Sequence, residues 1–261
     1  MYSSVLRVHQ KIDRAAYRQL QTLVSDLSEL HIKDIIHFEG KRGPDATKLK
    51  KGENEAPWHF YDPGGDNEEY ITTVEAHYSL LVDAIKSKNS ERAGFEASWL
   101  AHALVDGLTP AHHYPYKEAL DKLYGKDVKK SRKTVGHHFV VKGISKADTI
   151  KRSYKLVGPK GLLTTHTTFE AGAALIILPL SLTNAKLESF EVDAANGTVM
   201  LNTFKLYARE IKDMQMYERF YKFGWTPGLV RDVRLKLAPR MVQMVALAWL
   251  SAYKNADRFE V

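Results

Sequence analysis

The stretch FEASWLAHALVDGLTPAH, from Phe95 to His112, combines the pattern of a buried helix with polar groups that such a helix rarely buries. His102 and Asp106 are four residues apart, so in a helix they point the same way. Aromatic residues one and two turns earlier lie on the same stripe, which therefore faces the interior, and Pro110 ends the helix. Burying an imidazole beside a carboxylate is costly unless a partner satisfies both. A metal ion would do so, and so would a direct His–Asp hydrogen bond.

Helical periodicity continues on both sides of this stretch. A second helix is expected from Tyr70 to Ile85, and a third in the run that Pro239 opens, because proline suits a first helical turn. The N-terminal stripe, with apolar residues at three- and four-residue steps, comprises Val5, His9, Ile12, Ala16, Leu20, Leu23 and Leu27. Alternation of period two is rare. The sequence therefore predicts an all-α fold, with one multi-helix domain over residues 1–261.

The composition is that of an ordinary globular protein, with 44% hydrophobic and 26% charged residues. A domain of 261 residues can bury one substantial core. Cysteine is absent, which excludes disulfides and thiolate ligands. The longest apolar run, from about Ala171 to Leu182, is interrupted by Pro179 and is shorter than the roughly 20 residues that cross a bilayer.

Most of the positive charge lies in one segment. The chain carries a net charge of +7, whereas residues 117–160 alone hold thirteen Lys or Arg and four Asp or Glu, a net of +9. Such a segment suits a polyanion: nucleic acid, anionic lipid or a phosphorylated substrate. A solvated basic surface is an equally good interpretation.

Two further sets of residues resemble ligands. His166 and Glu170 repeat the four-residue spacing on another apolar helix stripe. A long loop rich in Gly and Pro, from Gly40 to Glu69, contains Asp45 and His59, which alone would be read as surface residues. Zinc binds histidine nitrogen and carboxylate oxygen, and helices of a bundle commonly supply both. The sequence therefore predicts a metal site among the helices.

These motifs together resemble the zinc-dependent phospholipase C and single-strand nuclease family. The family's His-x-x-x-Asp-x-x-x-Pro-x-His core is matched from His102 to His112, and its downstream His-x-x-x-Glu pair by His166 and Glu170. The phospholipase branch carries His-Phe-Tyr-Asp-Pro, which is matched letter for letter from His59 to Pro63, with an aspartate fourteen residues earlier. The matches span positions 45 to 170. The resemblance implies an all-helical zinc enzyme that hydrolyses phosphodiesters.

The resemblance also implies two to three zinc ions. The residues that would hold the first are Asp45, His59, His102 and Asp106. The residues that would hold the second are His112, His166 and Glu170. A third zinc would share Asp106 and take His9 and the terminal amine and carbonyl, although a buried non-ligand histidine is the plainer interpretation of His9. Family chains begin with tryptophan and this chain with Met1, so the third zinc is expected to be weak or missing. Asp45 is the candidate catalytic residue, which would orient or deprotonate the attacking water.

Three functions remain open on the sequence. A phospholipase C acting on glycerophospholipids is favoured by the His59–Pro63 string. A single-strand nuclease is favoured by the basic segment and its tyrosines, because cationic grooves with aromatic side chains hold unpaired strands. The third is a zinc-stabilised domain without activity. No serine elbow, P-loop or dinucleotide motif supports another mechanism.

The expected partners follow from these alternatives: a phospholipid or other phosphodiester substrate, and nucleic acid in the second case. No protein partner is implied. One account joins the phospholipase motif to the basic segment, which would hold the enzyme on an anionic membrane surface. The resemblance implies a secreted or periplasmic protein, whereas residues Met1 to Gln10 contain no apolar run typical of a secretory leader. On the sequence, the protein stays inside the cell or the chain starts after a removed leader.

Overall fold

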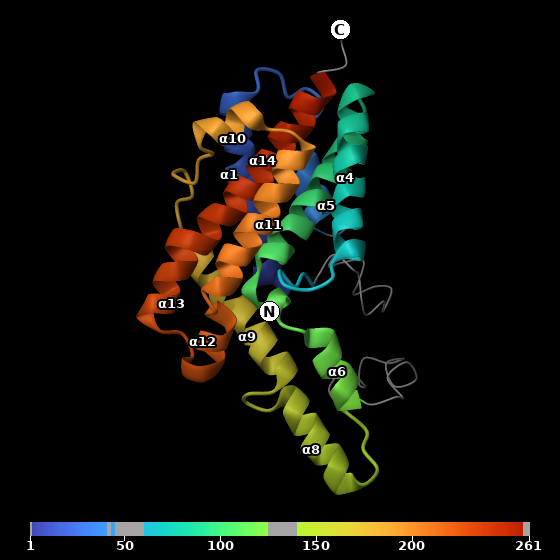
Figure 1. Cartoon of the computed structure of the whole chain (residues 1–261), viewed down its shortest axis with the longest axis vertical. Coiled ribbons are helices and arrows are strands. Elements are labelled where there is room, and N and C mark those ends of the chain that lie inside the picture. Colours follow the sequence, from blue (N-terminus) through green and yellow to red (C-terminus); the bar gives the residue numbers. More distant parts are fainter. Residues whose placement is uncertain (1, 41–42, 45–59, 125–139, 258–261) are drawn as a thin grey trace.

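The computed structural model describes residues 2–40, 43–44, 60–124 and 140–257, and these ranges contain helices and connecting turns without a strand. The predicted all-α fold is confirmed. Figure 1 shows an elongated bundle in which a pair of helices projects from one end, while the C-terminal helix ends at the other. Within the described ranges, no helix is both long enough and apolar enough to span a bilayer.

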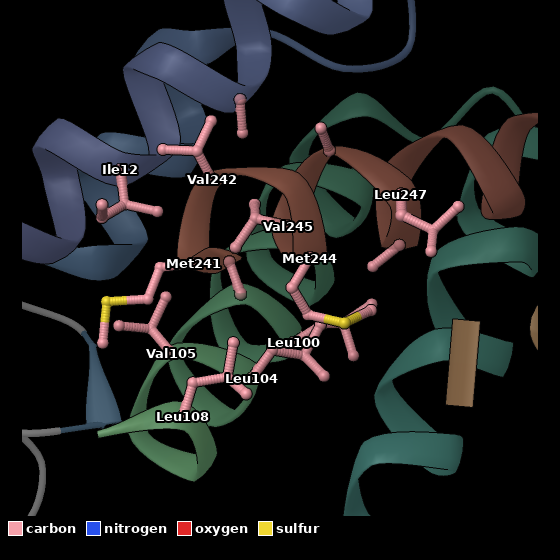
Figure 2. Packing of buried hydrophobic residues seen from close by; sticks show 14 of the residues in the cluster. Ile12, Leu100, Leu104, Val105, Leu108, Met241, Val242, Met244, Val245 and Leu247 are labelled. Carbon is pink, nitrogen blue, oxygen red and sulfur yellow. The ribbon is translucent and has the colours of Figure 1, made fainter. Parts of the chain in front are cut away.

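The bundle is organised around its last helix, α14 (Ala238–Asp257). It packs against α1 (Tyr2–Leu23), α4 (Glu68–Lys86), α5 (Ser90–Leu108) and α11 (Gly197–Asp213). Figure 2 shows how apolar side chains of α1, α5 and α14 interdigitate between these helices. Each Å² of apolar surface that is buried stabilises the fold by about 25 cal/mol, so this packing is the main stabilisation of the bundle. α5, which carries the His–Asp motif, is therefore fixed at the centre of the fold.

The predicted central helix agrees with α4, and the predicted N-terminal stripe agrees with α1 up to Leu23, whereas Leu27 lies beyond the end of that helix. Pro239 lies in the first turn of α14, but helical backbone does not begin there, because α13 (Pro227–Asp232) leads through a π turn (Val233–Leu237) directly into α14. A proline inside a helix lacks an N–H and crowds the carbonyl four residues earlier. The wider π turn just before Pro239 is a common way to relieve that conflict.

Shorter helices complete the bundle and the projecting pair. They are α2 (Ile32–Glu39), the 3-10 turn η2 (Pro110–His113), α6 (Tyr116–Tyr124), α8 (Lys146–Val157), α9 (Leu162–Ile177), α10 (Ser189–Ala194) and α12 (Met216–Phe223). The described parts of the basic segment form the projecting pair, α6 and α8, which have a small core of their own around Leu156. We call residues 116–124 and 140–160 the arm. Its base packs against α9.

Polar contacts and one glycine fix the position of α5. Nε1 of Trp249 on α14 donates to the carbonyl of Ala97, and the hydroxyl of Tyr70 on α4 donates to the carbonyl of Ala103. A side chain at Gly107 would collide with Tyr70 and with an aromatic ring of α11. Gly107 therefore allows α4 and α11 to approach α5 directly beside Asp106.

Buried His113 follows the motif and predicts a dependence of stability on pH. Its Nε2 donates to the carbonyl of Gly107 at 2.8 Å, and its Nδ1 has no hydrogen-bond partner among the described residues. Burial lowers the pKa of His113 to about 4. Because the unfolded chain takes up this proton at higher pH, the group stabilises the fold above its unfolded pKa, and that stability is lost as the pH falls toward the folded pKa.

Between pH 7 and pH 5, we expect the free energy of unfolding of the unaltered chain to fall by about 2 kcal/mol more than that of His113→Gln, which keeps a donor for Gly107. Urea unfolding of the chelator-treated proteins at both pH values measures this difference. His37→Gln on α2, which removes an exposed histidine, is the control and should follow the unaltered chain. Parallel pH profiles for all three proteins would contradict the prediction.

Candidate metal centre

Asp106, near the C-terminal end of α5, lies among three imidazole rings. Its Oδ2 is 3.2 Å from Nε2 of His102, one turn earlier in the same helix. Its Oδ1 is 3.4 Å from Nε2 of His9 on α1 and 3.7 Å from Nδ1 of His112 in η2. All four side chains are buried. One carboxylate therefore joins histidines from three separate elements.

Glu39, the last residue of α2, contacts two of these rings from their other side. Its Oε1 lies 3.0 Å from Nδ1 of His102 and 3.7 Å from Nδ1 of His9. The rings of His9 and His102 are stacked, with centroids 4.3 Å apart and planes 15° from parallel. Each ring therefore presents one nitrogen to Glu39 and the other to Asp106. We call His9, Glu39, His102 and Asp106 the first cluster.

The second cluster consists of His112, His166 and Glu170. Oε1 of Glu170 is 2.9 Å from Nε2 of His112 and 3.2 Å from Nε2 of His166. The two imidazole rings are stacked at 5.2 Å. The structure thus brings together all three residues that the family resemblance assigned to the second zinc.

His112 connects the two clusters, because its Nδ1 faces Asp106 and its Nε2 faces Glu170. A small cavity lies beside Asp106 and Glu170, the two carboxylates that His112 contacts. Its volume is about 40 Å³, and its lining includes His9, Asp106 and Glu170 among apolar side chains of α9 and α14. A space of that size accommodates a water molecule or an ion. The clusters are therefore parts of one polar centre, which is buried at the first cluster and partly exposed at His166 and Glu170.

The carboxylates control the protonation of this centre when no metal is bound. Burial disfavours the charged form of His102, but the charges of Asp106 and Glu39 outweigh it and place the pKa of His102 well above its usual value. Burial likewise opposes ionisation of Glu170, but His166 and His112 hold the pKa of Glu170 well below its usual range. Metal binding to His102 must therefore displace a proton.

The donor set of each cluster could hold a metal ion such as zinc. His9, Glu39 and His102 each offer an atom within 4.8 Å of the others, and the second cluster meets the same limit. Imidazole nitrogen and carboxylate oxygen are ordinary zinc ligands. In addition, Nδ1 of His166 is buried without a hydrogen-bond partner among the described residues. Unsatisfied buried nitrogens of this kind are costly, and a bound ion is one way to satisfy them.

Three residues of the sequence prediction lie outside the described residues: Asp45, His59 and Met1. The chain directly after His59 is described and lies against the second cluster. The ring of Phe60 is 5.4 Å from that of His112, and the N–H of Tyr61 donates to the carbonyl of His112. The described end of the long loop therefore lies beside the centre.

The sequence interpretation missed Glu39 and Asp13. Asp13 is one helical turn after His9 on α1 and is 1% exposed. Burial, and then the charge of Glu39, raise the pKa of Asp13 well above its ordinary value. The signal was present, since His9 and Asp13 have the spacing that identified the other two pairs. Glu39 likewise follows Ile35 by four residues on an apolar stripe.

Comparison of the chain with protein-family models, curated proteins and solved structures gives no match.

Proposed function

We propose that this protein is a zinc-dependent phosphodiester hydrolase, and specifically a phospholipase C acting on glycerophospholipids. The observation that carries the proposal is the arrangement of the buried carboxylate of Asp106 and the partly buried carboxylate of Glu170, which are connected through the ring of His112. Single His–carboxylate pairs occur in many folds as simple hydrogen bonds. Two pairs that share one histidine suit neighbouring metal ions, as in centres that hydrolyse phosphodiesters.

The chain's own residues have distinct parts in this proposal. Asp106 would contact both metal positions, and Glu39 would orient the imidazoles of His9 and His102. His166 and Glu170 would hold the second position from α9. Bound zinc would supply an activated water and neutralise charge on the phosphoryl oxygens. Asp45 remains the proposed group that orients or deprotonates that water.

The phospholipase assignment rests on the string from His59 to Pro63, together with the place of Phe60 beside the second cluster. The single-strand nuclease is the second candidate, favoured by the net charge of +9 over residues 117–160. Both candidates need the same metal centre. The two candidates differ in the substrate that would bind to the surface around the metal centre.

The test begins with metal content and hydrolysis of a small soluble phosphodiester. We expect the purified chain to contain at least two zinc ions, to lose hydrolysis after chelation and to recover it when zinc is restored. Zinc without hydrolysis would favour a zinc-stabilised domain that lacks activity. A chain that retains no zinc when supplied with it would refute the proposal.

The substrate is then decided by initial rates on mixed phospholipid vesicles and on single-stranded DNA, at equal phosphodiester concentration. The phospholipase assignment predicts faster release of head groups from the vesicles. Faster cleavage of DNA would replace it with the nuclease. The chelated protein serves as the blank for both substrates.

A further inference from the structure

Helix α8 of the arm has an inner face and an outer face of different kinds. On the inner face, Leu156 is buried against Tyr124 and Val141. On the outer face, Ile150 is 70% exposed, Tyr154 65% and Val157 38%. Spacings of four and three residues place these side chains on one stripe. One stripe of this helix therefore presents large apolar side chains that do not contribute to the arm's own core.

The turn before α8 extends this apolar surface. Ile144 is 96% exposed. Its N–H donates to Oδ2 of Asp148 at 3.0 Å, and the N–H of Gly143 donates to the hydroxyl of Thr149 at 2.9 Å. The N–H of Val141 is bonded in the same way to Ser153. Side chains of α8 thus fix this turn with Ile144 directed outward.

Exposed lysines flank the apolar stripe on both sides. With 100° per residue, Lys146 lies on one side of the stripe, and Lys151 and Lys155 lie on the other. A helix with an apolar stripe bordered by lysines is the arrangement of interfacial helices, whose apolar residues enter the acyl boundary while the lysines contact anionic head groups.

We propose that the outer face of α8, with Ile144, docks on a bilayer that contains anionic phospholipid. Figure 1 shows the arm at one end of the molecule, beyond the bundle. Charge complementarity selects the occupant. A two-fold pairing of this face with a second copy would bring the lysines of both copies together, and a nucleic acid would leave the apolar stripe in water.

The base of the arm adjoins the candidate metal centre. The ring of Tyr116, the first residue of α6, is 5.0 Å from that of His166, and only four residues separate the end of α8 from the start of α9. Docking would therefore bring the second cluster near the lipid surface. Docking would thus place the active site beside the lipid substrate, and in this respect the inference rests on the proposed phospholipase function. Binding of the protein to vesicles does not itself require hydrolysis.

Vesicle co-sedimentation tests the proposal, with phosphatidylcholine alone and with equal parts of phosphatidylserine. The Asp106→Asn chain is used beside the unaltered one, so that hydrolysis does not consume the vesicles. We expect both chains to bind the anionic vesicles. Lys146→Gln, Lys151→Gln and Lys155→Gln together should weaken binding by roughly 100-fold, about fivefold for each charge. High salt should remove the same electrostatic contribution to vesicle binding. Ile150→Ser, Tyr154→Ser and Val157→Ser together should weaken it by at least about tenfold.

Matched controls alter the same residue types outside the arm. Lys33, Lys88 and Lys236 are exposed lysines, and Phe190, Leu206 and Leu235 are exposed apolar residues. Their triple replacements should leave binding unchanged. Equal losses in control and arm variants would overturn the proposal. The proposal would also be overturned if substitutions in the apolar stripe changed only the mass of the protein in solution, which would indicate a dimer. The same holds if substitutions of the lysines changed only the binding of single-stranded DNA. Vesicle binding without lipid hydrolysis would support docking and refute the phospholipase.

Discussion

Replacement of Asp106 by asparagine is expected to reduce hydrolysis of a soluble phosphodiester by about 10³-fold, which corresponds to about 4 kcal/mol of transition-state stabilisation. The substitution keeps the shape of the side chain and removes its charge. That charge is within 3.7 Å of nitrogens from His9, His102 and His112. No other described carboxylate contacts imidazoles of both clusters, so its loss should weaken both metal positions together.

Metal analysis separates this explanation from simple unfolding. Asp106→Asn should retain fewer zinc ions than the unaltered chain after the same dialysis, while circular dichroism shows unchanged helix content. The core around α5 remains intact, because Trp249 and Tyr70 bond to the backbone of this helix rather than to Asp106.

Glu96→Gln is the matched control. Glu96 is on the same helix, fully buried, and paired with a histidine, His77, and with Arg92. Its neutralisation should cost stability and leave zinc content and the specific activity of the folded protein unchanged. If Glu96→Gln and Asp106→Asn lose activity and zinc to the same degree, Asp106 has no special part in the metal centre.

The fold could be predicted from the sequence because its helices are long and their apolar stripes are clear. The stripes of α1 and α4, and the face that includes Trp249 on α14, each indicate a helix that buries one side. The π turn before α14 could not be predicted, since Pro239 is equally compatible with a fresh helix start. The packing of α14 between four helices depends on long-range contacts that no local pattern contains.

Part of the candidate site could also be predicted, for a local reason. Residues four apart on a helix share a face, so His166 and Glu170 had to lie together. The meeting of His112 with this pair depends on how η2 packs against α9, and only the family resemblance linked them. Spacing therefore predicts pairs, whereas the joining of pairs into one centre requires the tertiary structure.

Glu39 is the clearest residue that such local reasoning missed. It is far in sequence from both histidines that it contacts, and it ends a short helix that has no histidine on its buried face. The structure nevertheless buries it completely, with Oε1 against Nδ1 of His102. A carboxylate in this place fixes the ring and its tautomer and increases the basicity of the nitrogen that binds metal.

We therefore expect Glu39→Gln to weaken zinc binding at the first cluster by about 10- to 100-fold. The amide keeps the size of the side chain, so packing is retained, but it removes the negative charge that helps the rings of His9 and His102 to bind a cation. Competition for zinc with a chromogenic chelator measures the affinity without relying on catalysis. The second cluster contains no atom of Glu39, so one class of zinc should weaken while the other remains.

Glu191→Gln provides the control, because Glu191 is a buried carboxylate that accepts a hydrogen bond from Tyr207 and contacts neither cluster. Glu39→Asp keeps the charge on a shorter side chain and should recover part of the lost affinity, which a purely steric role would not explain. Unchanged zinc affinity in Glu39→Gln would mean that Asp106 alone orients these two imidazoles. Because the rings are held between two carboxylates, and one of these ends a separate helix, we expect α2 to be a functional part of the metal centre.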